Sequence, residues 1–179
     1  AVMNFEKASV FRELSAEDLA LQGISYAKLR DFDSSKKVLD RVRVISPNSG
    51  VVMIALGVYY FEKGEFREAY YYFKKASERL PDSIEAKSGM LSSLVNIGVS
   101  EYKENPDIAL VYFKRALEMD PNFVPALQNC GVIAIEKGDI EKALYYFNKA
   151  ISFSSMKAGT PLLYHSHSSI ISVSYTHLR

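Results

Sequence analysis

The chain has 179 residues, of which 48% are hydrophobic and 24% are charged, and this balance excludes an intrinsically disordered protein. Its 22 basic and 21 acidic side chains give a net charge of +1, so no strong field is present to attract a nucleic acid. The sequence has no apolar run near the length of about 18 residues that predicts a membrane span, and no signal-peptide pattern at residue 1.

The first predicted element is a helix over residues 1–15. It contains Ala1, Phe5 and Ala8, and the same spacing of small and large apolar residues returns from Ala69 onward, in the second helix of a later pair. We therefore expect residues 1–15 to be the second helix of a truncated repeat, in a chain cut inside that repeat. The alternative is a solvent-facing start that only imitates the spacing.

Residues 16–49 predict the first complete helix pair. Ser15, with Asp18 three residues later, is a suitable N-cap for the first helix. Arg30 occupies the turn position at which later pairs have glycine, and Ser35 stands where later pairs have alanine. Because of these departures, we expect this pair to pack less closely than the next one.

Residues 50–83 contain the clearest pair, two amphipathic helices that are joined at Gly64 and ended by Pro81. Small residues such as Gly57 let two helix backbones approach closely, and large ones such as Phe73 fill the remaining space. A single pair of this length cannot bury its apolar face, so it requires neighbouring pairs.

Residues 84–123 predict an expanded pair. Counted from Ile84, Gly98 is in register with the preceding pair, yet the second helix arrives six residues late at Ala109. Six residues are about one and two-thirds helical turns. We therefore expect the extra length to prolong the first helix through Val99 to Glu104.

The second helix of this pair is expected to begin at Asn105, Pro106 and Asp107, which suit the N-cap, the first helical position and the positive end of the helix dipole. Two interpretations of the extension are open. It forms a partner contact through Tyr102, or it is tolerated drift in repeat length, and we favour drift.

Residues 124–157 return to the regular pattern, with Gly131, Gly138 and Phe147 at the expected places. Cys130 takes a position that requires an apolar contact, and no histidine accompanies it in the helix pairs. We expect it to be a small buried hydrophobe and not a nucleophile.

The tyrosine runs 70–72 and 145–146 suggest a stacking surface for bases, but consecutive residues point 100° apart on a helix. A packing role is therefore preferred. Tyr70 is expected in the core, in register with Leu110 and Leu144. The remaining column, which is expected to pack between units, comprises Tyr72, Tyr112 and Tyr146.

The last segment does not follow the pattern. Residues 158–172 predict an irregular tail, and residues 173–179 resemble the translated end of the transposon adapters that are used to prepare sequencing libraries, so we expect an artefact there. The three histidines, His165, His167 and His177, all lie in this segment. With no cysteine or carboxylate nearby they do not make a zinc site, and no metal or cofactor is expected.

The recurring columns identify the architecture. Small residues recur at spacings of 34, 40 and 34, with a second small or apolar residue seven positions after each: Ser35, Ala69, Ala109 and Ala143, then Val42, Ala76, Ala116 and Ala150. The pattern resembles the tetratricopeptide repeat, whose period is about 34 residues. The resemblance covers residues 1–157 and implies an all-α fold, a right-handed α-α superhelix of antiparallel helix pairs, with repeats 16–49, 50–83, 84–123 and 124–157.

In such arrays, the resemblance implies, the first helix of each pair forms the inner wall of a groove. The expected partner-binding residues on that wall are Ile24, Val51, Ile54, Val58, Phe61, Gln128, Val132 and Ile135. The same columns contain Ala20, Ala27 and Val95. Family members that bind the C-terminal carboxylate of chaperones have lysine, asparagine and arginine where this chain has Ala20, Ile24, Ile54 and Val58, so that carboxylate clamp is not expected.

We infer a non-catalytic scaffold that binds a peptide or an amphipathic helix in an apolar groove. The alternative is a substrate-recruiting arm of a larger enzyme or regulator whose catalytic domain lies outside this chain, and a third possibility is a spacer without a ligand. The single cysteine allows no internal disulfide and leaves the compartment open. A cytoplasmic location is only slightly favoured, because an export signal can precede residue 1.

Overall fold

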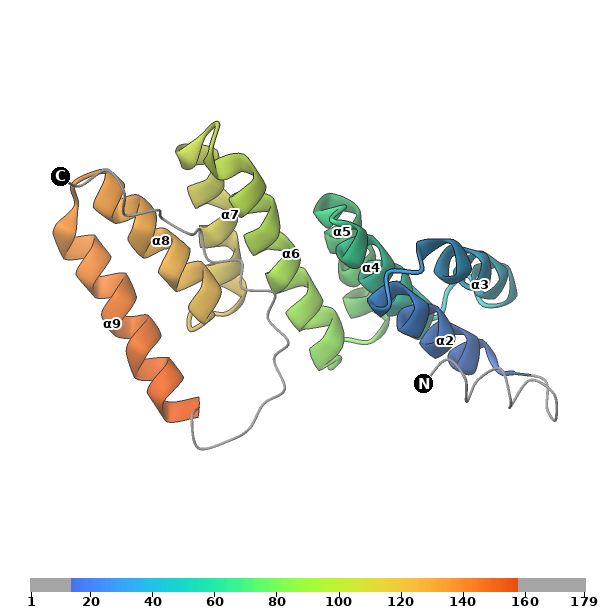
Figure 1. The fold of residues 1–179 in the computed structure, drawn as a ribbon. Coiled ribbons are helices and arrows are strands. Elements are labelled where there is room, and N and C mark those ends of the chain that lie inside the picture. Colours follow the sequence, from blue (N-terminus) through green and yellow to red (C-terminus); the bar gives the residue numbers. More distant parts are fainter. Residues whose placement is uncertain (1–13, 158–179) are drawn as a thin grey trace. The chain divides into compact units, whose positions relative to one another are not determined.

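The computed structural model describes residues 14–157, and all regular secondary structure in that range is helical. The helices are α2 (Ala16–Lys28), α3 (Phe32–Ile45), α4 (Gly50–Lys63), α5 (Phe66–Arg79), α6 (Ile84–Tyr102), α7 (Pro106–Met119), α8 (Val124–Glu136) and α9 (Ile140–Lys157) (Figure 1). The predictions for residues 1–13 and for 158–179, including those for His165, His167 and His177, fall outside the described residues.

The chain divides into two compact units between Ser93 and Leu94, which lie inside α6. The described part of the first unit contains α2 to α5 and the beginning of α6. That of the second unit contains the remainder of α6 and α7 to α9. Within each unit, helices that are joined by a short turn pack side by side, as α4 with α5 and α8 with α9 do (Figure 1).

Three of the turns share one backbone conformation. Gly64 and Gly138 have positive φ angles of 83° and 73°, and Arg30 has a φ of 61° at the corresponding place. This left-handed conformation reverses the chain after a helix, and it favours glycine because a Cβ atom makes it unfavourable. Arg30 therefore adopts the turn that the glycines make, and the alignment of these three positions is confirmed.

The beginnings of several helices agree with the capping residues that the sequence predicts. Ser15 and Asp18 form a capping box, in which the Ser15 hydroxyl accepts from the Asp18 amide and the Asp18 carboxylate accepts from the Ser15 amide. Asn105 accepts a hydrogen bond from the Ile108 amide at 3.1 Å, and Pro106 takes the first helical position. These bonds satisfy amide groups that have no partner inside the helix.

A glycine of the first helix faces a large side chain of the second helix in each regular pair. A Cβ atom built on Gly57 would lie 2.8 Å from the Phe73 ring, and one on Gly131 would lie 2.7 Å from the Phe147 ring. In the first pair the corresponding partner of the glycine is Leu39, a smaller side chain. The absence of a Cβ atom at these positions is what lets the ring seat against the neighbouring backbone.

The prolonged first helix of the third pair is observed in α6. It has 19 residues, where the first helices of the other pairs have 13 or 14, and it ends at Tyr102, two residues before the predicted Glu104. Gly98 does not make a turn, although counting from Ile84 puts it at the position of Gly64. It lies within α6 and faces Phe113, 2.5 Å from a built Cβ atom, so it has the packing role that Gly57 has in its pair.

The recurring small residues lie in the core. Ala69, Ala109 and Ala143 are buried, and Ser35 is buried in the same column, where its hydroxyl donates a 2.8 Å hydrogen bond to the carbonyl oxygen of Gly23. In the first unit the central cluster comprises Leu19, Ala20, Ala27, Leu39, Val42, Val52, Ala55, Leu56 and Tyr59. In the second unit the large buried side chains are Leu94, Ile97, Phe113, Phe123, Leu127 and Ile133.

Candidate functional site

The predicted partner-binding residues of the first unit follow one side of α4. Val51, Ile54, Val58 and Phe61 are spaced by three or four residues, and each is half-buried. The residues of α4 that pack into the core, such as Val52 and Leu56, lie elsewhere on its circumference and are buried. This side of α4 is therefore an apolar strip that remains partly accessible to solvent.

Ile24 of α2 lies 34 residues before Val58 and has the corresponding position in its own helix pair. Ile24 and Val51 both pack against the core cluster of the first unit, whereas Ile54 and Val58 are not members of that packing layer. Phe61 makes an edge-to-face contact with Phe66 of α5, with 5.4 Å between the ring centroids. Among the predicted residues, Ile24, Val51 and Phe61 thus have a packing contact within the first unit.

Three residues that share columns with the predicted partner-binding residues do not lie on the surface. Ala20 and Ala27 of α2 have no exposed surface, and Val95 of α6 is 1% exposed. These side chains are small or face neighbouring helices, so the packing of the units covers them. They cannot contact a partner unless the helices separate.

The predicted residues of the second unit lie on α8. Gln128 and Val132 are half-buried, and Ile135, in the last turn, is 47% exposed. They are spaced by four and three residues and so share one side of the helix.

Tyr102 was considered as a partner contact at the end of α6. Its hydroxyl donates a hydrogen bond to a carboxylate oxygen of Glu136, at the end of α8. Burial and this bond raise the pKa of Tyr102 above its usual range. The hydroxyl therefore joins two helices of the second unit.

The two columns that contain tyrosines differ from each other in their packing. Tyr72 has a packing role, but it stacks on Tyr60 of its own helix pair and not between pairs, with ring centroids 5.2 Å apart and planes 4° apart. The column that was predicted to be core is not uniformly so. Tyr70 and Leu110 are half-buried, and Leu144 is 58% exposed.

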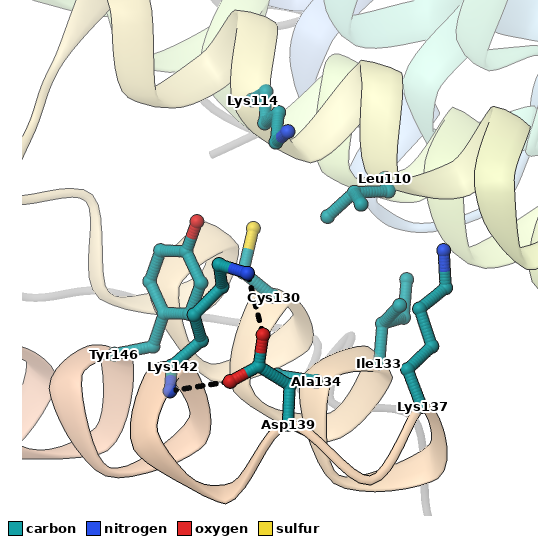
Figure 2. Close-up of a pocket in the computed structure, with 9 residues that line it drawn as sticks. All are labelled: Leu110, Lys114, Cys130, Ile133, Ala134, Lys137, Asp139, Lys142 and Tyr146. Atoms are coloured by element: carbon teal, nitrogen blue, oxygen red, sulfur yellow. Dashed lines mark hydrogen bonds and ion pairs between the residues drawn. The ribbon is translucent and has the colours of Figure 1, made fainter.

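Sequence reasoning missed a pocket in the second unit. It lies beside the turn between α8 and α9, has a volume of about 230 Å³, and is shown in Figure 2. The residues that line it come from α7, α8, α9 and the turn, and they are Leu110, Lys114, Cys130, Ile133, Ala134, Lys137, Asp139, Lys142 and Tyr146. A signal for it exists in the sequence, because Ala134 stands where the earlier pair has Tyr60.

Cys130 is one of the residues that line this pocket, and it is 1% exposed. Burial raises the pKa of its thiol to about 12, against a small opposing effect of Lys114. A thiol that stays protonated is a poor nucleophile. The expectation of a buried hydrophobe is confirmed for this residue.

The charged rim of the pocket comprises Lys137, Asp139 and Lys142, and Asp139 is the hydrogen-bond acceptor there. Its carboxylate accepts from the backbone amide of Lys142 at 3.1 Å and from the ammonium group of the same residue (Figure 2). These bonds lower the pKa of Asp139 and raise that of Lys142, so both groups are charged at neutral pH. Lys137 forms a further ion pair with Asp107 of α7.

Within residues 14–157 no group of three or more histidine, cysteine, aspartate or glutamate side chains is placed to hold a metal ion. Among the described helices, none combines the length and the apolar character that crossing a membrane requires.

Comparison with known proteins agrees with the repeat pattern. The family model described as tetratricopeptide repeat matches residues 112–145. The chain contains the tetratricopeptide repeat. It is 30% identical over 108 residues to the anaphase-promoting complex subunit CDC16 of Saccharomyces cerevisiae, a match that covers 60% of this chain and 13% of CDC16. It is also 29% identical over 124 residues to the TPR repeat-containing protein MJ1428 of Methanocaldococcus jannaschii, over 69% of this chain and 21% of that protein.

The chain therefore spans only about an eighth to a fifth of the length of these two tetratricopeptide relatives. Among solved structures, a crystal structure of MamA matches with a TM-score of 0.59 at 19% identity, over 88% of this chain and 89% of that one. At this identity the likeness concerns the fold. It confirms the predicted class, an all-α tetratricopeptide solenoid built from antiparallel helix pairs. Tetratricopeptide repeats are protein-interaction scaffolds and are generally non-catalytic.

Proposed function

We propose that this protein is a non-catalytic scaffold that binds a peptide or an amphipathic helix of a protein partner on the α4 strip, defined as Ile24, Val51, Ile54, Val58 and Phe61. The observation that carries the proposal is the accessibility of this strip. All five side chains are apolar, and all are only half-buried in the first unit.

The composition of α4 supports the proposal. From Val51 to Phe61 the helix has no charged residue, and it packs against α2, α3 and α5. A helix that is apolar all round is normally buried on every side. The part of α4 that remains accessible is therefore the part at which a partner gains most by excluding water.

An amphipathic helix fits this strip in chemical terms. Side chains at intervals of three and four residues on α4 match the spacing of apolar anchors on a partner helix. In the second unit the α8 residues Gln128, Val132 and Ile135 are proposed to contact a partner as well, as a separate and more polar row. CDC16, to which the chain is similar, is named as a subunit of a larger complex, and this is in keeping with a scaffold.

The test is a screen of a displayed peptide library against the whole chain, followed by titration of the selected peptides. Val58→Asp and Phe61→Asp are expected to weaken binding of a selected peptide by about tenfold or more, because each puts a charge into an apolar contact. Val44→Asp on α3 is the matched control. Val44 is 81% exposed and lies outside the strip, so its variant is expected to bind as the unmodified chain does.

Thermal unfolding followed by circular dichroism accompanies each titration. The strip variants are expected to unfold within a few degrees of the unmodified chain. A large loss of stability would instead assign Val58 and Phe61 to the core. Equal weakening by Val44→Asp, or no saturable binding of any library peptide, would overturn the proposed function.

A further inference from the structure

The pocket beside the α8–α9 turn has a counterpart in the first unit, and the comparison shows what is special about it. The pair α8–α9 repeats the pair α4–α5 at a constant spacing of 74 residues. Three correspondences establish this spacing, namely Gly57 with Gly131, Gly64 with Gly138, and Phe73 with Phe147. Each glycine has the same structural role as its counterpart.

In the earlier pair this place is filled with aromatic rings. Tyr60 stacks on Tyr72 at a centroid distance of 5.2 Å, and Tyr59 meets Tyr60 edge to face at 5.1 Å. In the later pair the counterpart of Tyr72 is still a tyrosine, Tyr146, but the counterpart of Tyr60 is Ala134. The missing ring leaves the space in which the pocket of about 230 Å³ lies.

The charges around this place are also reversed. In the first unit the four counterparts are Asp40 of α3 together with Lys63, Glu65 and Glu68, which are three carboxylates and one ammonium group. In the second unit they are Lys114 of α7 together with Lys137, Asp139 and Lys142, which are three ammonium groups and one carboxylate. The residues that line the later pocket therefore have a positive formal net charge, although the chain as a whole is nearly neutral.

One of these cations is available to a ligand. Lys137 and Lys142 are paired with Asp107 and Asp139, respectively. Within residues 14–157 no carboxylate forms an ion pair with the exposed Lys114, whose side chain extends from α7 over the pocket (Figure 2). The apolar residues that line the pocket are Leu110 of α7 and Cys130, Ile133 and Ala134 of α8.

The size of the pocket limits the ligand. Pockets that enclose small-molecule ligands usually have volumes of about 300–1,000 Å³, and this one is smaller. It accommodates a single side chain. We propose that the pocket binds one large apolar or aromatic side chain of an acidic peptide segment, with neighbouring aspartate or glutamate residues of that segment pairing with Lys114 and the rim.

This site is separate from the predicted α8 row. Successive residues turn by 100° around a helix, so Ile133, Ala134 and Lys137 lie on roughly the opposite side of α8 from Val132 and Ile135. A peptide in the pocket therefore leaves the row of Gln128, Val132 and Ile135 free. The site also shares no residue with the α4 strip, so the two proposals can fail independently.

The probe is a fluorescein-labelled peptide that has one phenylalanine between aspartate and glutamate residues, and its anisotropy is measured with the full chain. Two comparison peptides differ in one property each. One has asparagine and glutamine in place of the acids, and the other has alanine in place of phenylalanine. Both are expected to bind at least about tenfold more weakly, and binding of the acidic peptide is expected to weaken with added salt.

Two variants test the pocket itself. Ala134→Tyr restores the ring of the earlier pair, opposite Tyr146, and is expected to raise Kd by about tenfold or more by filling the space. Lys114→Asp introduces the residue that α3 has at the corresponding position, Asp40, at an exposed position and is expected to raise Kd to a similar degree without unfolding the chain. Lys103→Glu is the control, because this exposed lysine lies in the turn before α7, outside the pocket.

Amide chemical shifts in a ¹⁵N-labelled chain give the location. Shifts confined to residues 110–114 and 130–146 support the proposal, and shifts at Val58 and Phe61 instead overturn it. Equal affinity for the acidic and the neutral peptide would also overturn it, as would unchanged affinity in Lys114→Asp. If Ala134→Tyr does not fold, the Lys114→Asp titration and the peptide comparison still decide the question.

Discussion

The ring of Phe73 is seated directly against the backbone of Gly57, so that a Cβ atom on this glycine would lie 2.8 Å from the ring. Phe73 also packs against Gly89 of α6, where a built Cβ atom would lie 2.6 Å from it. One side chain of α5 thereby joins α4 to the first-unit part of α6.

Replacing Gly57 by alanine is expected to destabilise the protein by about 1–2 kcal/mol. Overpacking of a core costs about 1–3 kcal/mol, and the better helix propensity of alanine returns up to about 1 kcal/mol. Urea unfolding measures the loss. The double variant Gly57→Ala/Gly89→Ala is expected to cost less than the two single variants together, because both displace the same ring. A stabilised Gly57→Ala variant would show that the ring yields without cost.

The turn residues predict a reciprocal pair of substitutions. Gly138→Ala is expected to cost about 1 kcal/mol through its backbone alone, since no atom lies within 4 Å of a built Cβ atom. Arg30→Gly relieves the same strain and is expected to raise stability by a few tenths of a kcal/mol, after the loss of the contact between Arg30 and the Phe32 ring. Melting temperatures of both variants check this, and the expectation fails if Arg30→Gly is the more destabilising change.

Ser35 offers a test of the alanine column. Its counterparts are Ala69, Ala109 and Ala143, and its buried hydroxyl has the Gly23 carbonyl oxygen as its acceptor. Ser35→Ala removes the polar group together with its hydrogen bond, so a change within about 1 kcal/mol is expected. Ser35→Val adds volume at a fully buried position and is expected to cost more, about 1–3 kcal/mol. Equal stability of the two variants would show that the helices separate easily there.

Cys130 is expected to resist thiol reagents in the folded protein at pH 8. It is buried, and burial raises the pKa of its thiol to about 12 from an ordinary value of 9.0. Reaction with Ellman's reagent is expected to be slow under native conditions and complete in denaturant. Fast native reaction would mean that the α8–α9 pair opens readily.

The same thiol predicts a pH dependence of stability. In the unfolded chain the thiol ionises near pH 9, whereas in the fold it stays protonated up to about pH 12. Stability contributed by the protonated thiol is therefore present below pH 9 and is lost as the pH rises from 9 towards 12. The difference in unfolding free energy between the unmodified chain and Cys130→Ala is expected to shrink over that range, and a constant difference would contradict the assignment.

Much of the architecture could be predicted from the sequence because its signals are local or strictly periodic. Gly64 indicates a turn, since the left-handed conformation favours glycine. Asn105 and Pro106 indicate a helix start, because their chemistry suits unpaired amide groups. The columns of Ala69 and Phe73 recur at fixed spacings because the two helices of every pair pack against each other in the same way. The apolar strip on α4 follows from the same periodicity.

Other features depend on side chains that come together only in the folded units. Gly98 stands 34 residues after the turn glycine Gly64, but it lies inside the prolonged helix, and its packing against Phe113 is visible only in the folded unit. Ala20, Ala27 and Val95 share a column with accessible residues, and only the neighbouring helices decide that they are buried. The pocket lies where Ala134 stands in place of the earlier pair's Tyr60, and residues from three helices and a turn line it. The sequence by itself determined the repeating helix pairs, because the periodic spacing of apolar and turn residues is a local property of the chain. The tertiary structure decided which side chains are exposed and where a cavity lies, because both depend on contacts between residues that are distant in the sequence.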